Sequence, residues 1–91
     1  MLEIFRTSSF KSDFKKLNND DKEKLKVILI TLINGLELEQ KYKNHSLIGN
    51  YNNCMKCHVK PDLLLIYKIE LPINELQLVR IGSHAQLFKK S

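Results

Sequence analysis

The sequence predicts an α+β fold: two helices covering one face of a twisted, mainly antiparallel sheet, in the order β-α-α-β-β-β. Residues 20–34 carry apolar side chains at helical spacing. Residues 55–81 contain short alternating or continuously apolar segments separated by proline-containing breaks, which is typical of strands. The 91 residues, 43% of them hydrophobic, suffice for one domain, so we treat residues 1–91 as a single domain. The apolar face of its helices must be buried against a sheet.

The N-terminal third is predicted to form one strand and two helices. Residues 2–6 alternate as a strand does, and a hydroxyl side chain among residues 7–9 can cap the first helix. Asp20 and Glu23 have the spacing of a capping box for the second helix, and Gly35 is a plausible stop. Together the two helices should form a hairpin whose apolar face consists of Phe10, Phe14, Leu17, Leu25, Ile28, Leu29, Leu32 and Ile33.

The C-terminal half is predicted to hold a long loop and three strands. Residues 37–53 lack clean periodicity, and a loop of that length in a small domain is usually functional. Strands should cover residues 55–60, 63–69 and 76–81, and the middle one is apolar enough to be buried on both faces. Ser83 can cap a final helical turn that runs through Phe88.

The chain is basic, with fifteen Lys and Arg against ten Asp and Glu and a net charge of +5. A basic small domain attracts polyanions such as RNA, although a solvated charged surface explains the same composition. No segment approaches the ~20 apolar residues of a membrane span, and the N-terminus lacks the apolar stretch of a secretory signal. We therefore expect a cytoplasmic protein without a membrane partner, whose two cysteines are free thiols.

Residues 54–58 spell C-x-x-C-H, the pattern of c-type haem attachment. Haem attachment of this kind belongs to exported proteins, and no second Cys/His pair is close enough to complete a structural zinc site. On a strand, Cys54 and His58 would share one face while Cys57 points to the other. We interpret the cysteines as strand residues and expect no metal and no cofactor.

Residues suited to RNA cleavage gather in the C-terminal half, which contains all three histidines. Transesterification needs a base for the 2′-hydroxyl, an acid for the departing 5′-oxygen and a cation for the phosphorane. Histidine can serve as acid or base, and the planar fork of arginine suits phosphate oxygens. Neighbouring strand ends could bring His58, Asp62, Arg80 and His84 to one rim, although Arg80 could instead simply pair with Asp62.

Three segments resemble, in order, blocks of the YafQ-type toxins of the RelE superfamily. Residues 41–49 (KYKNHSLIG) resemble a YKDHPLKG segment of that family. Residues 57–68 (CHVKPDLLLIYK) resemble CHIKPDWLLIYK, and residues 78–88 (LVRIGSHAQLF) resemble LVRTGSHSDLF. The resemblance covers about half of the chain, and it implies a RelE-like fold that agrees with the predicted elements.

The resemblance also implies an activity. The chain would be the toxin of a type II toxin-antitoxin system, inhibited by an acidic antitoxin, and a metal-independent endoribonuclease that cuts mRNA at the ribosome. His84 and Asp62 would transfer protons, Arg80 would bind the scissile phosphate, and His45 and His58 would position or polarise the substrate. Phe88 would contact the substrate or hold the C-terminal turn, and we add the neighbouring basic residues Lys56 and Lys60 as substrate-binding residues.

Two positions depart from the family pattern. Leu63 replaces a tryptophan that many relatives carry, and Ser46 replaces a proline, which predicts a looser loop around His45 and an altered sequence preference. The alternative is a ParE-like inhibitor of DNA gyrase, or an inactive module that only binds antitoxin. The arrest of protein synthesis before DNA replication would favour the nuclease.

Overall fold

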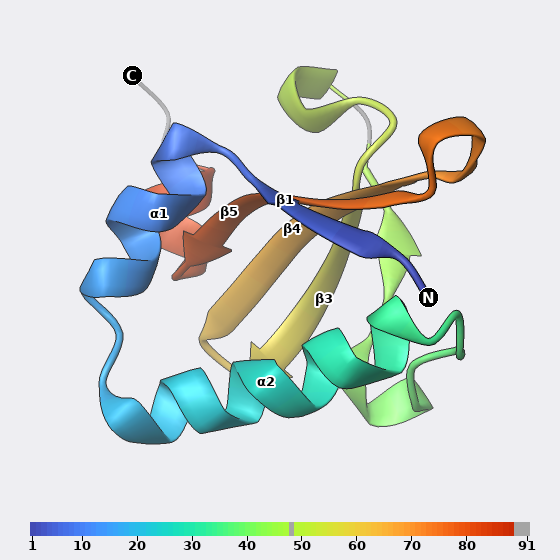
Figure 1. Ribbon diagram of the computed structural model, residues 1–91. Coiled ribbons are helices and arrows are strands. Elements are labelled where there is room, and N and C mark those ends of the chain that lie inside the picture. Colours follow the sequence, from blue (N-terminus) through green and yellow to red (C-terminus); the bar gives the residue numbers. More distant parts are fainter. Residues whose placement is uncertain (48, 89–91) are drawn as a thin grey trace.

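The computed structural model describes residues 1–47 and 49–88, and Figure 1 shows that they form one sheet flanked by helices. The strands are ordered β1-β5-β4-β3-β2, with only the β1–β5 pair parallel. The α+β class is confirmed. In chain order the elements are β1 (Glu3–Arg6), α1 (Ser8–Lys15), α2 (Asn19–Ile33), β2 (His45–Ser46), β3 (Met55–Lys60), β4 (Leu63–Glu70), β5 (Glu75–Gly82) and α3 (His84–Leu87).

The helix boundaries are set by side-chain caps. Thr7 accepts a hydrogen bond from the Phe10 amide and begins α1. Asn18, not Asp20, caps α2, because its side chain accepts from the Asp21 amide at 2.8 Å. The predicted capping box is therefore wrong: asparagine caps as well as aspartate, and the earlier start adds helix. Gly35 follows the end of α2 with a φ of 72°, as glycine at a helix terminus commonly does.

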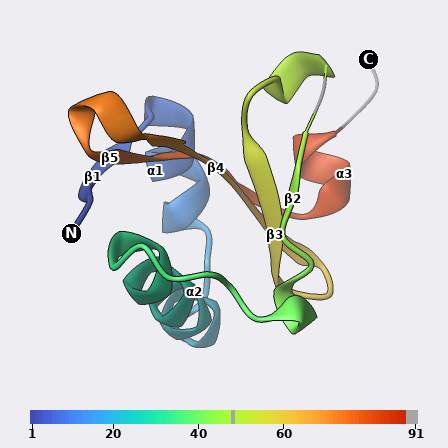
Figure 2. The same cartoon turned by 90° about the vertical axis from the view of Figure 1, so that its right-hand side faces the viewer.

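Each face of the sheet carries its own apolar cluster. Leu63, Leu65 and Tyr67 of β4 point into the larger cluster beneath α1 and α2. Leu64 and Ile66 point to the opposite side, where α3 packs. Figure 2 shows α1 and α2 on one side of the sheet and α3 on the other. The continuous apolar run of β4 is thus explained by burial on both faces.

The long segment between α2 and β3 is more ordered than the sequence predicts. It contains the short 3₁₀ turns Gln40–Tyr42 and Gly49–Tyr51, and the two-residue strand β2 pairs antiparallel with β3. A two-residue strand is too short to show alternation, so periodicity could not reveal it. Within the described residues, no helix combines the length and apolar character that crossing a membrane requires.

Candidate active site

Strand register places four of the predicted site residues, His45, Lys56, His58 and Arg80, on the α3 side of the sheet. Residues directly opposite one another on antiparallel strands project to the same face. Ile66 and Leu64 face α3, so their paired neighbours do too. Two adjacent rows of paired residues result, namely His45–Lys56–Ile66–Arg80 and His58–Leu64–Gly82.

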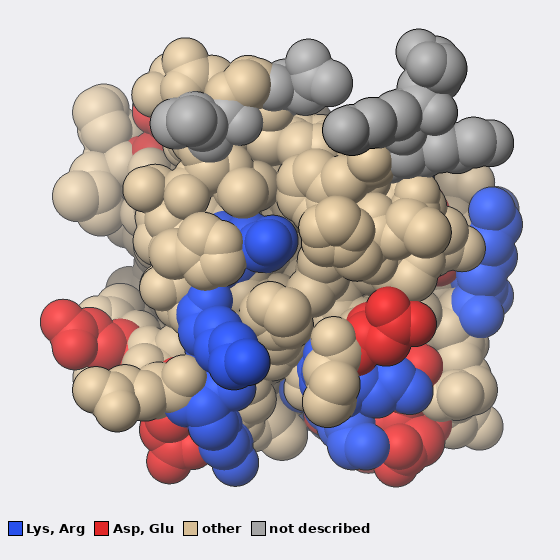
Figure 3. All heavy atoms as spheres, turned by 180° about the vertical axis from the view of Figure 1, so that it is seen from behind, with Lys and Arg blue, Asp and Glu red and all other residues tan. Residues whose placement is uncertain are grey.

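The spacing of strands shows how far apart these residues lie. Neighbouring strands are separated by roughly 5 Å, so His45 and Arg80, three strands apart, are about 15 Å apart at the backbone. The structure therefore gathers Lys56 and Arg80 near α3 and leaves His45 at the far edge. We call the row from His45 to Arg80, with the neighbouring residues of α3, the strip. Its length suits a polymer substrate that lies across the sheet. Figure 3 views this side of the molecule and shows lysine and arginine side chains in a column from the middle of this face to its lower edge.

The short helix α3 brings an aromatic cluster onto this strip. The His84 ring lies 4.9 Å from the Phe88 ring, and Tyr51 meets Phe88 edge-on at 5.6 Å. The Lys56 ammonium lies 5.2 Å from the centre of the Phe88 ring, within cation–π range. The Tyr51 hydroxyl donates to the Leu87 carbonyl at 3.1 Å and so ties the 3₁₀ turn to α3.

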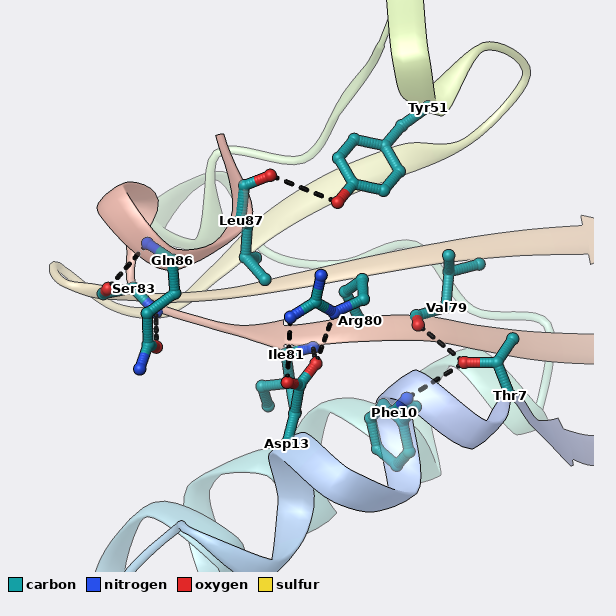
Figure 4. Close-up of polar contacts among 10 residues, drawn as sticks. All are labelled: Thr7, Phe10, Asp13, Tyr51, Val79, Arg80, Ile81, Ser83, Gln86 and Leu87. Carbon is teal, nitrogen blue, oxygen red and sulfur yellow. Dashed lines mark hydrogen bonds and ion pairs between the residues drawn. The ribbon is translucent and has the colours of Figure 1, made fainter. Parts of the chain in front are cut away.

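Arg80 is held by a residue that the sequence analysis did not select. Its Nε and Nη2 donate to the two carboxylate oxygens of Asp13 at 2.7 and 3.0 Å, so within the described residues its ion pair is with Asp13 and not with Asp62, the alternative that the sequence left open. Figure 4 shows the third guanidinium nitrogen pointing away from Asp13, toward the side where Tyr51 and Leu87 lie. Hydrogen bonding to Asp13 raises the pKa of Arg80 above its already high value, so the guanidinium stays charged.

Asp62 and Lys60 lie at the turn between β3 and β4. Asp62 is exposed and lines a hollow of about 290 Å³ together with Ser83 and Gln86 at the start of α3. His84 follows Ser83 in the chain as the first residue of α3, and it is not among the residues that line this hollow. Lys60 forms an ion pair with Asp21 of α2 at 2.7 Å, which directs its ammonium toward the helices.

The other two histidines lie toward the β2 edge of the sheet, His45 on β2 and His58 on β3. His58 is half-buried and shares a hollow of about 480 Å³ with Tyr42 and Lys43. His45 is exposed, and its Nδ1 lies 2.9 Å from the Lys43 carbonyl oxygen. A carbonyl oxygen only accepts, so Nδ1 must carry a proton, and Nε2 is left to face solvent or substrate. The catalytic roles of these residues stay predictions.

The cysteines lie as strand alternation predicts. Cys57 belongs to the cluster beneath the helices, whereas Cys54 packs on the α3 side. Burial raises the pKa of Cys57 to about 12 and raises that of Cys54, so both thiols are protonated at neutral pH. Within residues 1–47 and 49–88, no three His, Cys, Asp or Glu side chains converge as metal ligands would.

Two residues at the site were missed by sequence reasoning. Asp13 lies three positions after Phe10, so helical spacing alone would have placed it beside the buried face of α1. Its partner, 67 positions away, leaves no sequence signal. Tyr51 lies in a segment without periodicity, and only its aromatic character within a functional loop could have suggested it.

Comparisons with known proteins agree with this architecture. The family model for the YafQ toxin of bacterial type II toxin-antitoxin systems matches residues 2–89. The mRNA interferase toxin YafQ of Escherichia coli K12 is 42% identical over 69 residues, which cover 75% of this chain and 73% of that protein.

Solved structures resemble the whole molecule. A metal-bound toxin from Helicobacter pylori is 42% identical with a TM-score of 0.89, over 97% of this chain and 100% of that chain. YafQ in the E. coli DinJ-YafQ complex is 33% identical with a TM-score of 0.81, over 97% of this chain and 99% of that chain. Family model, relative and structures agree, and the chain belongs to the YafQ family of bacterial toxins of type II toxin-antitoxin systems.

Proposed function

We propose that this protein is an endoribonuclease that cuts mRNA on the ribosome and thereby inhibits translation in the cytoplasm. The observation that carries the proposal is the Arg80 guanidinium, fixed on one edge by Asp13 and directed with its third nitrogen toward Tyr51 and Leu87, beside the basic, aromatic strip. Such a group suits the oxygens of a phosphodiester. Family membership and the mRNA interferase activity named for the E. coli relative support the same reading.

In the proposed reaction the nucleophile comes from the RNA itself, so no metal-bound water is needed. The 2′-oxygen loses its proton and bonds to phosphorus, while the bond from phosphorus to the 5′-oxygen breaks. One of Asp62 and His84 accepts the first proton and the other protonates the leaving oxygen, while Arg80 stabilises the charge on the phosphorane. The products are a 2′,3′-cyclic phosphate and a 5′-hydroxyl.

The remaining residues of the strip hold the substrate. Phe88, with His84 on one side and Tyr51 at its edge, offers an aromatic surface on which a base could stack. Lys56, above the same ring, would neutralise a neighbouring phosphate. His45 and His58 line the part of the strip nearer β2 and would position the following nucleotides.

We also propose an acidic antitoxin as the partner, since the E. coli relative has been solved in a DinJ-YafQ complex. Exposed apolar side chains lie on β1 and α2, including Phe5 at 49% exposure and Ile30 at 52%. A hollow of about 640 Å³ between α1 and α2 is rimmed by lysines, among them Lys11, Lys15 and Lys22. A disordered acidic segment that folds there would cover apolar surface and neutralise charge together.

The decisive test uses a message with one 2′-deoxynucleotide immediately 5′ to the cut, added to translating ribosomes with the purified toxin. We expect this substitution to block cleavage, whereas a 2′-deoxynucleotide two positions further upstream should not. The ordinary message should yield a 2′,3′-cyclic phosphate or the monophosphate left when that ring opens. Cleavage of the substituted message at the normal rate would overturn the mechanism.

Two variants test the residues. His84→Ala and Arg80→Ala should each slow cleavage on the order of 100-fold or more, because each removes a proton-transfer group or a phosphate-binding cation. Circular dichroism should show that both variants remain folded at the assay temperature. Full activity in folded Arg80→Ala and His84→Ala proteins would contradict the site assignment.

A further inference from the structure

The Asp13 carboxylate is one of the most heavily bonded acidic groups in the described part of the chain. It accepts from Arg80 Nε at 2.7 Å, from Arg80 Nη2 at 3.0 Å and from the Ile81 amide at 3.1 Å. Its side chain is 12% exposed and that of Arg80 is 28% exposed. The pair is therefore better shielded from water than an ordinary surface salt bridge, and both partners are fixed in one geometry.

The fold explains why a helix residue reaches this position. β1 pairs with β5 only as far as Leu78, so the next part of β5 is an open edge. α1 takes over this edge: the Thr7 hydroxyl donates to the Val79 carbonyl at 2.7 Å, and nearly two helical turns later Asp13 accepts from the Ile81 amide. The carboxylate thus meets Arg80 side-on, at the rim of the strip (Figure 4).

We propose that Asp13 is a positioning residue for the proposed RNA cleavage, acting through Arg80. A guanidinium has five N–H donors, and Asp13 takes two of them along the Nε–Nη2 edge. Nη1 and the second hydrogen of Nη2 are left for two oxygens of one phosphate, on the side of the guanidinium that is directed toward Tyr51 and away from Asp13. Asp13 therefore prevents the long side chain from rotating and selects the end-on approach. This inference rests on the proposed function.

The direction in which Asp13→Asn changes RNA binding distinguishes a positioning role from a simple effect of net charge. Asp13→Asn removes a negative charge, which by itself would tighten RNA binding. Asparagine also turns an N–H group toward the donors of Arg80 and so breaks the bidentate pair. If Asp13 positions Arg80, RNA binding and cleavage fall although the net charge of the protein rises by one.

The test is a double-mutant cycle on binding of a non-cleavable RNA, 2′-O-methylated at the nucleotide 5′ to the cut. We expect Asp13→Asn to weaken binding about tenfold and to slow cleavage of the ordinary RNA about as much or more. In an Arg80→Ala background the same substitution should leave RNA binding unchanged or slightly tighter, because only the charge effect remains.

Thr7→Val is the matched control for a purely structural effect. It removes both hydrogen bonds of the Thr7 hydroxyl, the one to the Val79 carbonyl and the cap of α1, and it should lower stability without changing binding or cleavage by the folded protein. Unchanged binding and cleavage in folded Asp13→Asn, or an equal loss in the Arg80→Ala background, would overturn the inference alone. Full activity in Arg80→Ala protein would instead overturn the proposed site.

Discussion

At the scale of single residues, the core beneath α1 and α2 contains two titratable groups. Burial raises the pKa of Cys57 to about 12 and that of Tyr67 to about 12. The Tyr67 hydroxyl donates to the Asn44 side chain at 2.7 Å, and this bond anchors the loop immediately before His45. Tyr67 thus links the core to the far end of the candidate site.

These two groups predict how stability depends on pH. Both pKa values are raised above their ordinary values of 9.0 and 10.0, so the folded protein holds protons that the unfolded chain releases. Stability should therefore be unaffected by them below pH 9 and fall as pH rises from 9 toward 12. Each group contributes a slope of about 1.4 kcal/mol per pH unit while its protonation differs between the two states. Urea unfolding at successive pH values measures this decline.

Tyr67→Phe is the control for this prediction. It should lower stability by about 1 kcal/mol at pH 7 through loss of the Asn44 bond, and it should reduce the slope above pH 10. The part of the slope that begins near pH 9 should persist, because it belongs to the thiols of Cys57 and Cys54, whose pKa values burial also raises. Stability that stays constant up to pH 11 would contradict the assignment of both groups.

At the scale of elements, α3 is a four-residue helix that carries His84 and supports Phe88. A capping box fixes its start: Ser83 Oγ accepts from the Gln86 amide, and Gln86 Oε1 accepts from the Ser83 amide at 2.8 Å. A helix this short has little intrinsic stability, so its cap and the burial of Leu87 decide whether it forms. The placement of the catalytic candidate His84 depends on these local contacts.

Gly82 is predicted to be required for this cap. A Cβ at position 82 would lie 2.7 Å from Gln86 Oε1, closer than Cβ atoms normally come, so the end of the glutamine side chain would have to shift and its bond to the Ser83 amide would weaken. Gly82→Ala should therefore cost about 1 kcal/mol of stability and lower cleavage activity by loosening α3. Thermal unfolding and a cleavage assay on the same samples measure both effects.

Gln86→Ala supplies the comparison. Alone it should cost about as much stability as Gly82→Ala, because both lose the bond to the Ser83 amide. In the Gln86→Ala background, Gly82→Ala should cost little further, since the clashing atom is gone. Additive losses would show that Gly82 matters for another reason.

At the scale of the whole molecule, the two sides of the sheet present different surfaces. The α3 side carries the strip proposed to bind RNA, and the opposite side presents the lysine-rimmed hollow between α1 and α2. Arg80 and Asp13 join the two sides, because α1 contributes to the hollow and also holds the arginine. A partner seated on α1 would therefore lie close to the candidate catalytic residues.

The proposed antitoxin complex should survive moderate salt. Phe5 and Ile30 are exposed apolar residues that a partner could bury, and apolar burial is not screened by ions. Copurification of tagged toxin with its antitoxin should persist at about 0.5 M NaCl, where the Debye length is only about 4 Å. A Phe5→Ser, Ile30→Ser variant should release the antitoxin at lower salt than the parent. Dissociation of the parent complex at modest salt would show that charge alone holds it.

The pattern of apolar residues was enough to predict the α+β class, the main strands and the apolar faces of both helices. These features follow from local periodicity, which a sequence displays directly. Helix starts were less certain, because Asn18 and Asp20 cap equally well and only the backbone decides between them. The resemblance to the YafQ family, which the family model confirmed, supplied the site residues that periodicity could not.

Only the tertiary structure decided which of these residues meet. The sequence by itself determined that Arg80 and the three histidines lie in the C-terminal half, and that the ends of neighbouring strands could bring some of them together. Strand register placed His45 and Arg80 at opposite ends of one row, and the open edge of β5 brought Asp13 rather than Asp62 to the arginine. The physical reason is that pairings across 67 positions depend on packing and chain topology, and neither leaves a local pattern in the sequence.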